Sequence, residues 1–206
     1  MFHIATAFNF VENYSAELMQ KSTLTPELIS ACKAGSRKAQ EEVYRMYSGK
    51  MFAVCMRYAN ETMEAEDILM IGFTKVFTKI GSYNGQGSFE GWIRSIIVNS
   101  ALSAYYKNQR RVQTTSYDNA IHAKETAIND QRCDIDYLLK ALQALPNPYQ
   151  MAFNMFVLEG YSHREIGEKL AITESLSKVH VSRARKLLQD NLNKVALRME
   201  RSYFAA

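Results

Sequence analysis

Proline is nearly absent from this 206-residue chain, and its positions restrict the possible folds. The three prolines are Pro26, Pro146 and Pro148, so about 120 residues between the first two lack the residue that most often breaks a helix. An apolar fraction of 47% is sufficient for ordinary cores, and the length suits one large or two small domains. We therefore expect an all-α fold.

The clearest local pattern lies in residues 159–188, which predict two short helices joined by a tight turn. Gly160 is expected to close the preceding helix. Ser162 is expected to cap the first helix, with Glu165 as its capping-box partner, and Thr173 to cap the second. This arrangement is typical of a helix-turn-helix that lays its second helix in a DNA groove.

Positive charge is concentrated in the same part of the chain. Residues 160–206 hold nine Lys/Arg against five Asp/Glu, which suits a polyanionic partner. A recognition helix usually contacts bases from its N-terminal end and phosphates around it. The candidates for base contacts are Ser175, Lys178 and Ser182. The candidates for phosphate contacts are Arg183, Arg185 and Lys186. The alternative, in which these cations only cover a solvated helix, stays open.

A helical wheel of the second helix predicts which residues face the core. The inward residues are expected to be Leu176, Val179, Ala184, Leu187 and Leu188. His180 falls near this apolar side, so it is expected to be a packed histidine.

Four carboxylates stand near the start of another predicted helix, at Glu61, Glu64, Glu66 and Asp67. Acidic residues at a helix N-terminus complement the helix dipole, which explains part of the cluster. A helical metal-dependent hydrolase using Glu64, Glu66 and Asp67 is the alternative. Because no second acidic cluster or histidine pair completes such a site, we expect no enzyme activity, no metal and no cofactor.

A glycine-rich loop precedes a further helix that begins near Glu90. Asn99 lies on its polar side, and a carboxamide can both donate to and accept from a base edge. Tyr106, Lys107 and Arg110 add the mixture of aromatic and basic side chains that suits unpaired, stackable bases. These four residues are the second group of candidates for contact with nucleic acid.

The periodicity predicts four segments. Residues 1–24 form an N-terminal extension, and residues 25–111 form a helical domain that begins at the Thr25 cap. Residues 112–133 lose the apolar period and read as a linker. Residues 134–206 form the second helical domain.

Several classes of protein are not indicated. The three cysteines form no C-x-x-C pair, so neither a disulfide framework nor a zinc site is expected. The N-terminus lacks the basic region of a signal peptide, and no apolar run is long enough to span a bilayer. A cytoplasmic protein without membrane insertion is the expectation.

Three blocks of this sequence follow one another along the chain. The first is AEDIL at residues 65–69, followed by Gly72 and Phe73. The second is GSFEGWI at residues 87–93, with Val98 and Asn99. The third comprises Leu145, Pro146, Phe153, Asn154, EGYSH at residues 159–163, Glu165, Ile166 and SRAR at residues 182–185. In this order the blocks resemble region 2.2, regions 2.3 and 2.4, and region 4 of the extracytoplasmic-function class of bacterial RNA polymerase sigma factors.

The resemblance implies a region 2 domain that binds core polymerase and opens the minus-10 element, and a region 4 domain that reads the minus-35 element. By position it places Glu66, Asp67, Met70 and Phe73 on the polymerase-facing helix, and it places Asn99 where a flipped minus-10 base is read. Lys178, Arg183 and Arg185 fall on the minus-35 helix. An anti-sigma factor is a further possible partner.

Two departures from the family pattern affect these expectations. Met70 and Ile71 replace the usual Gln and acid in region 2.2, and Ser175 and Leu176 replace the usual Gly-Thr early in the recognition helix. We expect a sigma factor that binds core polymerase and promoter DNA and uses no small-molecule substrate. The alternative within the binding class is a divergent helix-turn-helix regulator that no longer engages polymerase.

Overall fold

The computed structural model describes residues 24–113 and 134–204. All regular elements in these two ranges are helical, so the predicted all-α class is confirmed. The chain divides into two compact units, residues 1–114 and 115–206. The predicted N-terminal extension and nearly all of the predicted linker lie outside the described residues. None of the described helices is both long and apolar enough to cross a membrane.

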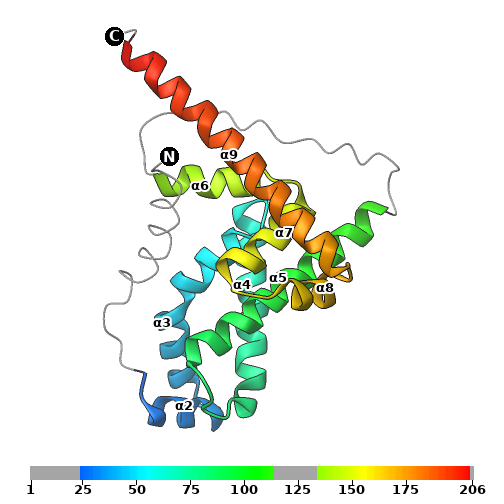
Figure 1. Ribbon diagram of the computed structural model, residues 1–206. Coiled ribbons are helices and arrows are strands. Elements are labelled where there is room, and N and C mark those ends of the chain that lie inside the picture. The colour runs from blue at the N-terminus through cyan, green and yellow to red at the C-terminus, as the bar shows by residue number, and fades with distance from the viewer. Residues whose placement is uncertain (1–23, 114–133, 205–206) are drawn as a thin grey trace. The chain divides into compact units, whose positions relative to one another are not determined.

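In the described residues of the first unit, α3, α4 and α5 pack against one another, and α2 packs against α3 (Figure 1). Their bounds are α2 Pro26–Lys33, α3 Arg37–Met56, α4 Thr62–Lys79 and α5 Phe89–Gln113, with a 3-10 turn at Ile80–Ser82. The predicted Thr25 cap is confirmed, because its Oγ1 accepts from the Leu28 amide at 3.2 Å. Helix α5 continues through Gln113, two residues into the predicted linker.

Helices α4 and α5 approach closely at Gly72. A Cβ atom added there would overlap Cδ1 of Ile97, which is fully buried. Lys75 also joins the two helices, since its Nζ donates to Ser100 Oγ at 3.1 Å. This close packing fixes the exposed faces of α4 and α5 relative to each other.

The second unit contains α6 Asp134–Gln143, α7 Asn147–Phe153, α8 His163–Leu170 and α9 Glu174–Phe204. The helix that precedes Gly160 ends its α-helical part at Phe153 and continues as a π-helical turn over Asn154–Leu158. Gly160 then has φ 75°, in agreement with its predicted role as the closing residue. The apolar core includes Met151, Phe153, Met155, Ile166, Val181 and Ala184.

The predicted caps of the helix-turn-helix are confirmed. Ser162 and Glu165 form a complete capping box at the start of α8. Thr173 Oγ1 accepts from the Leu176 amide at 3.1 Å at the start of α9. Between them, Ala171 adopts the left-handed conformation with φ 52°, and the Ile172 amide donates to the Gly167 carbonyl at 3.0 Å. These contacts make the tight turn that sets α8 against α9.

Candidate nucleic-acid interface

The buried side of α9 is rotated from the side that the helical wheel predicts. Ser177 is 0% exposed and shares this side with Val181, Ala184 and Leu188. Leu176 and Val179, which were expected to face inward, are each 40% exposed, so that part of the prediction is wrong. Ser177 faces the interior in place of these two residues, because its Oγ lies 3.0 Å from His163 Nδ1 on α8.

The candidate base-contacting residues lie on exposed parts of α9. Ser175, Lys178 and Ser182 are all exposed. Lys178 is held by Glu174 one turn earlier, with 2.7 Å between Nζ and Oε1, and both side chains are at least half exposed. Lys178 is therefore accessible, but it must leave Glu174 before it can bond to another acceptor.

Two of the three candidate phosphate-contacting residues rest on aromatic rings. Arg183 Nη1 donates to the Tyr149 hydroxyl at 3.1 Å, and its Cζ lies 6.0 Å from the centre of that ring. Arg185 Cζ lies 5.7 Å from the centre of the Phe156 ring. Lys186 is also exposed. Contacts with α7 and the π-helical turn thus position Arg183 and Arg185, and both side chains remain exposed.

Both histidines of the helix-turn-helix are packed against rings. His163 stacks on Phe156 with ring centres 4.2 Å apart, and His180 lies 5.3 Å from Tyr149. The expectation for His180 is thus confirmed. Burial lowers the pKa of His163, and Lys178 lowers it further. Burial also lowers the pKa of His180, with Arg183 as the second cause.

The candidates on α5 follow one side of that helix. Asn99 and Lys107 are exposed, and Tyr106 is half-buried with its ring centre 5.5 Å from that of Tyr105. The Asn99 carbonyl accepts from Ser103 Oγ at 2.8 Å. Arg110 continues the same side along the backbone, but its side chain lies outside the described residues. The structure thus brings Asn99, Tyr106 and Lys107 to one surface.

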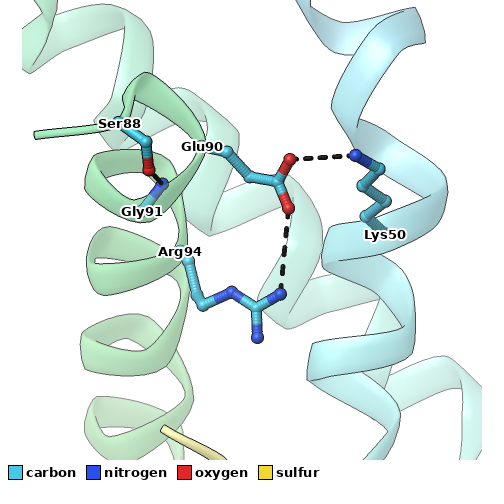
Figure 2. Close-up of polar contacts among 5 residues, drawn as sticks. All are labelled: Lys50, Ser88, Glu90, Gly91 and Arg94. Atoms are coloured by element: carbon cyan, nitrogen blue, oxygen red, sulfur yellow. Dashed lines mark hydrogen bonds and ion pairs between the residues drawn. The ribbon is translucent and has the colours of Figure 1, made fainter. Parts of the chain in front are cut away.

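The N-terminal end of α5 is fixed by contacts that sequence reasoning missed (Figure 2). Ser88 Oγ accepts from the Gly91 amide at 3.0 Å and caps the helix. Glu90 Oε2 lies 2.9 Å from Lys50 Nζ on α3, and its Oε1 lies 3.9 Å from Arg94 Nη2. Because Lys50 is 40 residues away from Glu90, no local pattern in the sequence could reveal this pair.

The predicted polymerase-facing residues of α4 divide between surface and core. Glu66 and Asp67 are exposed, and Met70 and Ile71 are 66% and 50% exposed. Phe73 is 3% exposed and packs edge-on against Tyr44, with ring centres 4.8 Å apart. Phe73 therefore lies on the expected helix, but its ring is almost fully buried and supports α4 from within.

In the acidic first turn of α4, the Glu64 carboxylate accepts hydrogen bonds from two asparagines. Glu64 Oε2 accepts from the Asn60 amide at 2.9 Å, and its Oε1 accepts from Asn108 Nδ2 on α5 at 2.8 Å. In the described ranges, no group of three His, Cys, Asp or Glu residues is placed to hold a metal ion. Glu64 thus joins the start of α4 to the far part of α5.

Two family models, each for one region of the Sigma-70 proteins, match this chain in the order in which the two units occur. Residues 43–111 match Sigma-70 region 2, and residues 135–188 match Sigma-70, region 4. The chain belongs to the extracytoplasmic-function sigma factors. It is therefore a promoter-directing sigma factor that binds core RNA polymerase and promoter DNA.

Individual relatives of this sigma factor are distant. It is 28% identical over 160 residues to the ECF RNA polymerase sigma factor SigE of Mycolicibacterium smegmatis, covering 75% of this chain and 62% of that relative, which is less than two thirds of its length. It is 25% identical over 177 residues to SigW of Bacillus subtilis, covering 80% and 94% of the two chains.

A similar fold occurs in the crystal structure of the sigma factor RpoE in complex with the anti-sigma factor NepR from Bartonella quintana. That comparison has a TM-score of 0.51 at 21% identity and covers 74% of this chain and 96% of that one.

The lowered pKa values of the two histidines predict how acid affects the helix-turn-helix of this sigma factor. A histidine whose folded pKa lies below its unfolded value contributes stability that is complete above about pH 6.5 and is lost as the pH falls. We expect the amides of α8 and α9 to exchange faster at about pH 5 than their intrinsic rates explain. In the double variant His163→Gln, His180→Gln, the exchange rate of these amides should depend less on pH. An equal pH dependence of exchange in the variant and the unchanged protein would contradict the prediction.

Proposed function

We propose that this sigma factor binds core polymerase and the two promoter elements through three exposed helix surfaces. Glu66, Asp67 and Met70 on α4 contact core polymerase, and α5 holds the opened minus-10 strand. The outer side of α9 reads the minus-35 element. The domains that carry these functions are residues 25–111 and 134–206, with residues 112–133 as the linker. The protein acts in the cytoplasm, as a binding subunit and not as an enzyme.

The observation that carries this proposal is the exposed, cationic side of α9 within a capped helix-turn-helix. Lys178, Arg183, Arg185 and Lys186 are all exposed there. Phosphate contacts fix the register of a recognition helix, and hydroxyl or ammonium groups at its N-terminal end can reach base edges. Ser175 and Ser182 supply the hydroxyls on the same helix.

For the minus-10 element, the proposal assigns an extruded base to Asn99. Unstacking one base step costs a few kcal/mol, which a hydrogen-bonding pocket and nearby cations can offset. Asn99 supplies a carboxamide on the exposed side of α5, and Lys107 supplies an exposed cation two turns later. Tyr106, between them and half-buried, supplies a ring on which a neighbouring base can stack.

An anti-sigma factor is proposed as a second partner of the α4 surface. Met63 is 71% exposed, and together with Met70 and Ile71 it gives this helix an apolar exposed ridge. Apolar exposed patches rimmed by charge are common at protein interfaces. The relative from Bartonella quintana is in complex with an anti-sigma factor.

Transcription from mapped promoters tests the proposed function. The full chain and core polymerase should yield transcripts that start at discrete sites on genomic DNA of the source organism. We expect Asn99→Ala to reduce open-complex formation about fivefold, the loss of about one hydrogen bond, while polymerase binding stays unchanged. Ser103→Ala, one turn away on the same side of α5, is the control. A chain that captures no core polymerase, or an Asn99 variant with unchanged promoter opening, would contradict the assignment.

A further inference from the structure

Two apolar side chains stand on the outer side of the recognition helix. Both Leu176 and Val179 lie within the first two turns of α9, and each is 40% exposed. At about 100° per residue, Val179 lies nearly opposite the buried side formed by Ser177, Val181 and Ala184. Leu176 lies to one side of Val179. Neither residue therefore contributes to the core of this unit.

Polar and cationic side chains surround this pair. Ser175, Ser182, Arg183 and Lys186 lie one or two turns from Val179 on the same side of α9, and all are exposed. Leu176 also lines a hollow beside the turn, together with Arg164 and Glu168 of α8 and Glu174 of α9. Hydrocarbon set among charged and polar side chains is poorly suited to an apolar protein partner. It suits a DNA groove, whose walls are phosphates.

We propose that Leu176 and Val179 contact the C5-methyl groups of thymines in the major groove of the minus-35 element. This inference rests on the proposed role of α9 in reading that element. Thymine alone presents a methyl group in the major groove. Against the other bases, hydrocarbon would cover a donor or acceptor without satisfying it, which is costly. The two side chains thus select T·A base pairs.

The spacing of the pair also fits neighbouring base pairs. Three residues of an α-helix advance about 4.5 Å, and successive base pairs are about 3.4 Å apart. Leu176 and Val179 can therefore reach thymines at adjacent steps, on either strand. We expect at least one thymine in the half of the minus-35 element that the start of α9 faces.

Replacing thymine by deoxyuridine tests the inference, because only the methyl group is removed. Binding is measured with holoenzyme, assembled from the full chain and core polymerase, on a mapped promoter. We expect one substitution at a contacted thymine to weaken binding about fourfold, as expected for one buried methyl. Leu176→Ala or Val179→Ala should weaken binding to the thymine promoter and abolish most of the difference between thymine and deoxyuridine. Gln189→Ala, exposed further along α9, is the matched control and should keep the full difference.

The outcomes separate this inference from the function on which it rests. A minus-35 element without thymine, or unchanged binding to every deoxyuridine promoter, overturns the inference alone. The inference is also overturned if Leu176→Ala and Val179→Ala weaken binding to thymine DNA and to deoxyuridine DNA by the same factor. Binding that also ignores base-pair changes in the minus-35 element overturns the reading role of α9, and the inference with it.

Discussion

Gly167→Ala is expected to destabilise the helix-turn-helix by about 1–3 kcal/mol. A Cβ atom at residue 167 would lie 2.8 Å from the Ile172 carbonyl oxygen, closer than real Cβ contacts occur. Because that oxygen belongs to the backbone, no change of rotamer can relieve the overlap, and the turn between α8 and α9 must open. In a unit of this size, each kcal/mol lowers Tm by about 4–8 °C. Thermal unfolding of the full chain measures the effect.

Gly49→Ala provides the matched control for this substitution. Gly49 lies inside α3, and a Cβ atom there would meet nothing within 4 Å. Alanine is favoured over glycine in a helix by about 1 kcal/mol, so this variant should be more stable than the unchanged chain. Stabilisation by both substitutions would show that helix propensity outweighs the contact at Ile172, and would contradict the prediction.

Local rules were enough to predict where three of the described helices of this protein begin. The caps Thr25, Ser162 and Thr173 each accept from the amide three residues ahead, so their signal lies within a few residues of sequence. The all-α class followed from the same short-range information. The π-helical turn at Asn154–Leu158 was not predicted, because it differs from an α-helix only in which carbonyl each amide reaches.

The candidate site was less accessible to sequence reasoning, because it depends on contacts between helices. Ser177 is buried and lies against His163 on α8. As a result, Leu176 and Val179 fall on the outer side of α9. Phe73 lies in the region 2.2 block, but Tyr44 on α3 covers its ring. In both cases a family motif or a wheel identified the correct helix, and packing against another helix decided which side chains were exposed.

Lys178 and Arg185 should respond differently to replacement, although both are cations on α9. If Lys178 bonds to a base, Lys178→Ala loses about 1–3 kcal/mol of discrimination between the correct and a changed minus-35 sequence. Arg185 rests on Phe156 and is assigned to phosphate, so Arg185→Ala should weaken all sequences alike and lower the salt slope by about one. Holoenzyme binding to matched and changed promoters over a range of salt concentrations separates the two results.

Glu174 offers a sharper test of the same assignment. Its Oε1 holds Lys178 Nζ at 2.7 Å, and the bond to Lys178 lowers the pKa of its carboxyl group, so it is ionised near neutral pH and competes with DNA for the ammonium. We expect Glu174→Gln to strengthen binding to the correct promoter and to leave the effect of Arg185→Ala unchanged. In a Lys178→Ala background, Glu174→Gln should increase promoter affinity only because it removes one negative charge that repels the phosphates. Equal weakening of all sequences by Lys178→Ala would show that Lys178 contacts the backbone and that Glu174 does not regulate base reading.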